Sequence, residues 1–157
     1  MISASAFATN LATLSITTTK PGGTTGALNI KSLATMPRNI ENRDCDVLIP
    51  ASEFQTGLTM ERASAGVNAF REVDWTANYV YCFCEIGRNR WAQEFNDTIA
   101  DNVKAICDAI AAGLTTLGVV DIQPGPASDT GIVVMANDKK FYGAQIDIAI
   151  HDWYNST

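Results

Sequence analysis

Charged residues are scarce in this chain. Asp, Glu, Lys and Arg make up 18% of its 157 residues, against about 25% in an average soluble domain. The formal net charge is −6, with a pI near 4.6. Binding of nucleic-acid phosphates needs clustered Lys and Arg, so this composition argues against a nucleic-acid-binding protein. A surface with so little charge suits a protein that buries much of that surface against partners.

Long apolar runs are also missing. No run approaches the roughly 20 residues that span a bilayer, and the opening "MISASAFATNLATLSI" lacks the basic start and solid apolar centre of a signal peptide. We therefore expect no membrane partner and a reducing, cytosol-like compartment. Four cysteines are too few for a dense disulfide framework. Hydrophobic residues make up 46% of the chain, which predicts a single globular domain over residues 1–157.

Two helices are predicted from apolar residues that recur at helical spacing. In the first, over 3–14, Phe7, Leu11 and Leu14 share one face, and Ser3 or Ser5 is a suitable N-cap. The second covers 90–113, with Asn89 as its cap, Gly113 as its stop, and charged residues off its apolar stripe. That stripe consists of Trp91, Phe95, Ile99, Val103, Ile106 and Ile110.

The clearest strands are 74–86 and 141–153. The last strand alternates strictly, which is typical of a half-buried antiparallel strand: Ala144, Ile146, Ile148 and Ile150 fall on one face, and Gln145, Asp147, Ala149 and His151 on the other. Shorter strands are predicted at 27–33, 45–51, 115–123 and 132–136, with loops or turns at 20–26, 124–131 and 137–140.

Residues 51–73 show no clean period, and we interpret them as a long irregular excursion with a helix possible around 59–65. Long loops in compact domains are usually functional or bound to a partner. Runs of strands separated by one long helix predict an α+β fold. We expect a mostly antiparallel mixed sheet, with one long helix packed across it and a short N-terminal helix.

Two cysteines stand one residue apart in "YVYCFCEIG". On a strand, Cys82 and Cys84 point to the same face, because side chains alternate. A zinc site needs about four ligands, and only Cys45, Cys107 and His151 remain as candidates. Both faces of this strand are largely apolar. We therefore expect buried thiols that fill space, with no metal site and no cofactor.

The search for catalytic residues finds no candidate stronger than its structural interpretation. His151 is the only histidine, and on a strand its neighbour Asp152 points to the opposite face. We therefore expect His151 to be a surface histidine. "PGGTTG" lacks the GK[ST] ending of a phosphate-binding loop, and no GxSxG elbow is present. Lys139 and Lys140 are expected at a solvated hairpin tip. We name no catalytic residue and expect a protein that is not an enzyme.

The organisation of the chain resembles that of the small tail terminator and neck proteins of long-tailed bacteriophages. The resemblance rests on the junction "YCFCEIGRNRWAQEFNDTIADNVKAICDAI" and on the ending "TLGVVDIQPGPASDTGIVVMANDKKFYGAQIDIAIHDW". It covers about 75–157 and, more loosely, the first helix. In that family a short N-terminal helix precedes a mixed sheet, one long helix packs across the sheet, and an antiparallel strand set ends the chain.

The resemblance implies a virion structural protein, assembled in the host cytoplasm, that forms a hexameric ring at the head-proximal end of a tail. Such a ring ends tube growth and joins the tail to the head connector, so the partners are copies of the chain, the tube protein and connector or adaptor proteins. DNA passes through the lumen without specific binding. The excursion at 51–73 and the loop 124–131 are candidates for contacts between subunits.

Alternatives remain open. Within virion proteins they are a head-closure or adaptor protein and a tail-tube subunit. In other classes they are a small enzyme or ligand-binding domain that uses His151 with nearby carboxylates, and a metal-binding thiol protein that uses Cys82, Cys84 and Cys45.

Overall fold

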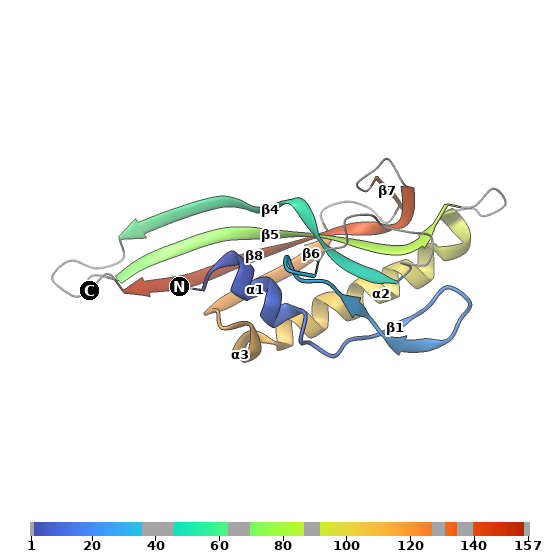
Figure 1. Cartoon of the computed structure of the whole chain (residues 1–157), viewed down its shortest axis with the longest axis horizontal. Coiled ribbons are helices and arrows are strands. Elements are labelled where there is room, and N and C mark those ends of the chain that lie inside the picture. Colours follow the sequence, from blue (N-terminus) through green and yellow to red (C-terminus); the bar gives the residue numbers. More distant parts are fainter. Residues whose placement is uncertain are drawn as a thin grey trace.

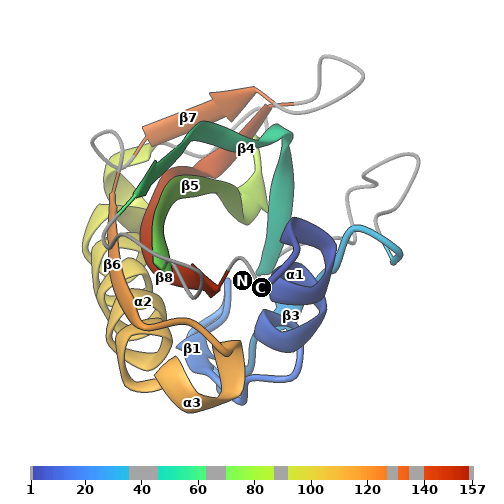
Figure 2. The same ribbon diagram turned by 90° about the vertical axis from the view of Figure 1, so that its left-hand side faces the viewer.

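The fold combines a curled mixed sheet with α-helices, so the expected α+β class is confirmed. A computed structural model describes residues 2–35, 46–62, 70–86, 92–126, 131–134 and 140–155. The sheet order is β3-β4-β5-β8-β6, and β7 also pairs with β8. β3 runs parallel to β4, whereas the other described pairs are antiparallel. Figure 2 shows the curl of this sheet end-on.

Three strands of equal length form the centre of the sheet. They are β4 (Val47–Arg62), β5 (Phe70–Glu85) and β8 (Lys140–Asn155). β8 confirms the strand expected at 141–153, and β5 begins four residues before the strand expected at 74–86. The three strands run past the helices at one end of the molecule (Figure 1). We call this end the arm and define it as Met60–Arg62, Phe70–Val73 and Asp152–Asn155, which pair in register.

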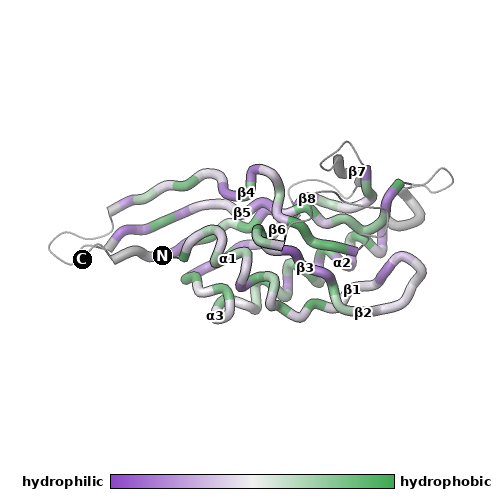
Figure 3. Tube along the Cα trace, in the orientation of Figure 1, coloured by the Kyte–Doolittle hydropathy of each residue, from purple (hydrophilic) through white to green (hydrophobic). Residues whose placement is uncertain are grey.

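The expected irregular excursion at 51–73 is wrong for the described residues, because 51–62 belong to β4 and 70–73 to β5. The possible helix around 59–65 is wrong for 59–62, and 63–69 lie outside the described residues. The reason is visible in the register, which shifts between Pro50 and Gln55 and again between Thr56 and Thr59. Each shift breaks the period of two, and Gly57, at φ 66°, lies within the second one. Figure 3 shows how the hydropathy changes along β4.

In the described part of the first third of the chain, the strands differ from those expected. β1 (Thr17–Thr19) and β2 (Thr25–Ala27) form a separate antiparallel hairpin. The loop predicted at 20–26 is therefore correct for 20–24, which connect the two strands, and wrong for 25–26. The strand expected at 27–33 shrinks to β3 (Asn29–Ile30). The strand expected at 45–51 corresponds to the start of β4, which begins at Val47 and continues to Arg62, far beyond the predicted end.

A second region, 114–134, was predicted with wrong boundaries. Residues 115–117 belong to the short helix α3 (Leu114–Leu117), which ends at Gly118 in the left-handed conformation. β6 (Asp121–Pro126) follows, so 124–126 are strand and not loop, while 127–130 lie outside the described residues. β7 (Gly131–Val134) confirms the strand expected at 132–136 as far as Val134, and 135–139 lie outside the described residues. Of the turn expected at 137–140, only Lys140 is described, and it begins β8.

The helices α1 (Ala4–Leu11) and α2 (Ala92–Ala112) are present where helices were predicted. The Ser3 side chain caps α1 by accepting a hydrogen bond from the Ala6 amide at 3.2 Å. α1 ends before Leu14, whereas Asn89 and Trp91 lie outside the described residues. Within the described part of the chain, neither helix is long and apolar enough to cross a bilayer.

Both helices pack against the same face of the sheet and form the main core with it. α1 contributes Phe7 and Leu11, and α2 contributes four residues of its predicted stripe, Ile99, Val103, Ile106 and Ile110. From β5 come Tyr79, Tyr81 and Phe83, and from β8 come Ala144, Ile146, Ile148 and Ile150, all of them buried. The predicted core face of β8 is therefore confirmed. Its other face, which carries Gln145, Asp147, Ala149 and His151, turns away from α1 and α2.

Candidate functional site

The candidate site is the face of the sheet that α1 and α2 leave uncovered. The register pairs Asp74 with His151 and Asn78 with Asp147, so polar side chains of β5 and β8 stand side by side. None of these four residues is buried. We call this surface the polar face and define it by Asp74, Thr76, Asn78, Gln145, Asp147, Ala149 and His151. Two shallow cavities, of about 290 Å³ and 310 Å³, lie along it.

The first cavity contains a histidine–carboxylate pair. His151 Nδ1 lies 2.7 Å from Asp74 Oδ1, and the edge of the imidazole contacts the Trp153 ring at a centroid distance of 5.9 Å. The hydrogen bond to Asp74 raises the pKa of His151 above its ordinary value, and the negative charges of Glu72 and Asp121 add to this effect. The cavity therefore favours a protonated, positively charged imidazole.

The chemistry available in this cavity is limited. Thr76 and Gln123 also line it, but no serine or cysteine does among the described residues. The expectation that Asp152 points away from His151 is confirmed, because Asp152 is buried and accepts a hydrogen bond from the Ile2 amide at 3.1 Å. His151 was predicted to be at the surface, and its side chain is 32% exposed. Sequence reasoning missed Asp74 as its partner, because the two residues lie 77 positions apart.

The second cavity is lined by carboxylate, amide and hydroxyl groups. The Asn78 side-chain amide donates hydrogen bonds to the Glu53 carbonyl at 3.0 Å and to Thr56 Oγ1 at 2.9 Å, which fixes β4 at its register shift. Asp147 lies opposite Asn78 and is half-buried, and this burial raises the pKa of its carboxyl group. Within the described residues, the Asp147 carboxylate forms neither an ion pair nor a hydrogen bond.

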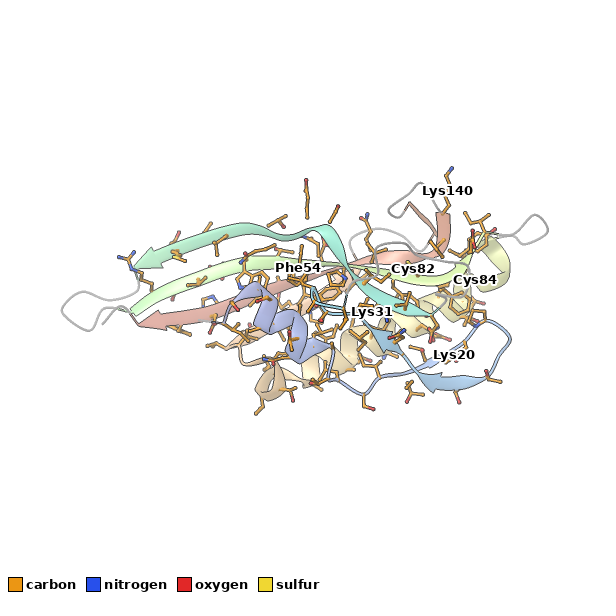
Figure 4. All side chains as sticks on the ribbon, in the orientation of Figure 1. Lys20, Lys31, Phe54, Cys82, Cys84 and Lys140 are labelled. Carbon is orange, nitrogen blue, oxygen red and sulfur yellow. The ribbon has the colours of Figure 1, made fainter. Side chains whose placement is uncertain are left out.

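Apart from His151, the charged side chains that line the two cavities are carboxylates. Glu53, Asp74, Asp121 and Asp147 line the two cavities, and neither cavity is lined by a lysine or arginine from the described part of the chain. Lys140 is exposed at the start of β8, away from the arm, as Figure 4 shows. Lys139 lies outside the described residues. The arrangement repels polyanions and attracts cationic groups.

The cysteines are not part of this site. Cys82 is buried in a small second cluster with Val47, Ile49, Val80 and Phe141. Cys84 packs instead against the main core, so the expectation that the two thiols share a face is wrong. The reason is a register shift between them in the pairing of β5 with β8, because a bulge of one residue reverses the alternation. Figure 4 shows both cysteines toward the end of β5 that is remote from the arm.

The other cysteines add no metal site within the described residues. Cys107 is half-buried on α2, and this burial raises the pKa of its thiol. Cys45 lies outside the described ranges. In the part of the chain that the structure describes, no three His, Cys, Asp or Glu side chains are placed to hold a metal ion together.

A buried polar network, which sequence reasoning missed, fixes the β1–β2 hairpin to the sheet. Asp46 is 1% exposed and accepts hydrogen bonds from Tyr81 Oη at 2.6 Å, Thr18 Oγ1 at 2.8 Å and Lys20 Nζ at 2.5 Å. Asn102 of α2 donates to Tyr81 Oη at 2.9 Å. Burial, followed by the hydrogen bond to Asp46, raises the pKa of Tyr81 far above its ordinary value. The available signal in the sequence was an aspartate directly before the apolar run "VLI", because a carboxylate next to a buried strand needs hydrogen-bond partners.

Comparison of the chain with protein-family models, with curated proteins and with solved structures found no significant match. The function of the chain is therefore inferred from the geometry described above and from the sequence resemblance.

Proposed function

We propose that this chain is a virion structural protein that forms a ring at the head-proximal end of a phage tail, ends tail-tube growth and joins the tail to the head connector. The observation that carries the proposal is the polar face. It is a sheet surface that neither α1 nor α2 covers, with four carboxylates around its cavities and no lysine or arginine in their lining within the described residues.

A wall of this kind suits a channel through which DNA passes. Phosphate binding depends on clustered cationic side chains, and this surface has four carboxylates against one histidine in its cavities, so its net charge repels DNA. At physiological salt the repulsion acts within about 8–10 Å of the wall. It therefore keeps DNA from adhering to the surface without closing a wide lumen. The overall net charge of −6 has the same sign.

The shape of the sheet suits assembly with neighbouring subunits. Among the described residues, β3 pairs with β4 only at Val47 and Leu48, so the edge of β4 from Ala51 onward carries backbone groups that another chain can contact. Leu58 and Met60 on this stretch are about half exposed, at 49% and 46%. The opposite edge, β6, contains Pro124 and Pro126, which remove backbone donors and protect an edge.

Purified protein tests this proposal directly. We expect closed rings of about six subunits, formed alone or on tail tubes, in light scattering and negative-stain images. Long filaments would instead favour the tail-tube alternative, because a tube subunit polymerises without closing. Rings that bind connector proteins but not tube ends would favour a head-closure or adaptor protein.

A second candidate is an acid–base enzyme or ligand-binding domain centred on His151. The hydrogen bond between His151 and Asp74 at the first cavity favours it, because an oriented imidazole is a common general acid or base and its protonated form acts as the acid. A monomer in light scattering that turns over a substrate, and loses turnover in His151→Ala, would establish this candidate and overturn the ring.

A further inference from the structure

An arginine on the arm has no charge partner among the described residues. Arg71 is exposed and lies between Arg62 of β4 and Tyr154 of β8 in register. Like charges on directly opposed strand positions destabilise a sheet. Arg71 takes part in no ion pair or hydrogen bond with the described residues. The arm therefore carries an exposed guanidinium group whose pairing with a carboxylate would stabilise the protein.

Near the middle of the same sheet lies a carboxylate whose charged form a cation would stabilise. Asp147 is half-buried in the second cavity beside the backbone of Glu53, and burial disfavours its charged form. A guanidinium group in this cavity restores the lost solvation of the carboxylate and forms directed N–H···O bonds with it. The amide side chains of Asn78 and Gln145, which also line the cavity, offer further acceptors. The cavity volume of about 310 Å³ is ample for an arginine head group.

The two groups cannot meet within one chain. Asn78, which pairs with Asp147, lies seven residues from Arg71 along β5, a separation of roughly 23 Å at the rise of a β-strand. Arg71 also shares a strand face with Val73 of the main core, whereas Asp147 lies on the polar face. A contact between the arm and the opposite face near the middle of the sheet joins two different patches, which is the heterologous type that closes rings.

We propose that Arg71 on the arm of one copy binds the Asp147 cavity of a second copy, and that this ion pair sets the head-to-tail contact between subunits. The arm then covers the second cavity, and the part of the polar face around the first cavity, with Asp74 and Asp121, stays open to the lumen. The inference rests on the proposed ring, and it names the residues and the chemistry of its interface. Because the pair joins a half-buried carboxylate to an arginine, removal of either charge leaves the other uncompensated and weakens the interface.

Charge reversal with compensation tests this contact. We expect Arg71→Glu and Asp147→Arg each to raise the concentration at which rings form by at least about tenfold. We expect the double variant to recover a large part of this loss, because its charges are exchanged. The matched control is Lys104→Glu with Asp108→Lys, which exchanges an exposed i,i+4 pair on α2 and should leave ring formation unchanged. Thermal unfolding of each variant shows whether its fold is intact.

The outcomes distinguish failure of the Arg71–Asp147 contact from failure of the proposed ring. Recovery of assembly in the double variant supports the pairing. Wild-type rings that form equally well in both single variants overturn the contact but leave the proposed function standing. Folded single variants that fail to assemble, with no recovery in the double variant, also overturn the pairing. Wild-type protein that stays monomeric, both alone and when mixed with tail tubes, overturns the proposed function itself.

Discussion

At the scale of single residues, Asp46 is a buried carboxylate on which three other side chains depend. Its carboxylate accepts hydrogen bonds from the side chains of Thr18, Lys20 and Tyr81, and it has a positive φ of 55°. Few residues adopt this conformation easily, and Asp and Asn are among those that do. The position therefore selects both for a carboxylate and for a short polar side chain.

We predict that Asp46→Ala lowers the free energy of unfolding by about 3 kcal/mol, because it leaves buried donors without an acceptor and strains the backbone. Asp46→Asn keeps one acceptor and the backbone preference, and should cost about half as much. Urea denaturation at neutral pH measures both. Lys104→Ala on α2, whose amine pairs with Asp108 at the exposed surface, is the control and should show no measurable change. Equal stability of Asp46→Ala and wild type would contradict the prediction.

At the scale of elements, the close approach of β5 and β8 depends on Gly143. A Cβ atom at this position would lie 1.8 Å from the Tyr81 carbonyl oxygen, a distance that backbone atoms cannot relieve without moving apart. The clash lies beside the register shift that separates Cys82 from Cys84. We therefore predict that Gly143→Ala destabilises the fold by about 3 kcal/mol or more.

Gly125 provides the matched control for this prediction. It lies in β6, which pairs with the strand β8 that contains Gly143, but a Cβ at Gly125 meets no atom within 4 Å. Gly125→Ala should therefore change stability by no more than about 0.5 kcal/mol. Chemical denaturation of the two variants compares them, and equal effects would show that contact with Tyr81 does not decide the cost.

The elements that sequence reasoning predicted well are those with an unbroken period. α2 keeps its apolar stripe from Ile99 to Ile110, and β8 alternates without interruption from Ala144 to His151, so local patterns suffice. β4 was missed because two register shifts break its alternation. The strand expected at 115–123 was placed too early, because β-branched residues favour a strand where Gly118 ends a helical turn instead.

The candidate site was less predictable than the fold, because its pairs form across strands. Asp74 meets His151, and Asn78 meets Asp147, only once β5 and β8 align in register. No local pattern encodes that register. The sequence did predict the polar face of β8 correctly, and with it half of the surface on which the functional proposal depends.

At the scale of the whole molecule, carboxylates lie on the polar face, opposite the face that packs against α1 and α2. This arrangement leads to a prediction about DNA. We expect wild-type rings to bind neither linear nor circular duplex DNA at physiological salt, because the polar face presents carboxylates. Rings that carry Asp74→Lys with Asp121→Lys present cations at the first cavity of the polar face instead. If that face lines the lumen, preformed variant rings should bind linear DNA, which can thread through them, and should not bind closed circles, which cannot.

The control for this prediction places the same charge change elsewhere. Asp101→Lys with Asp108→Lys alters two exposed positions on α2, outside the polar face, so rings with these changes should bind linear and circular DNA alike. Fluorescence anisotropy or gel shift with both forms of one duplex provides the measurement. If the polar-face variant binds circles as well as linear DNA, that surface lies on the outside of the ring, and the carboxylates face a protein partner in place of DNA.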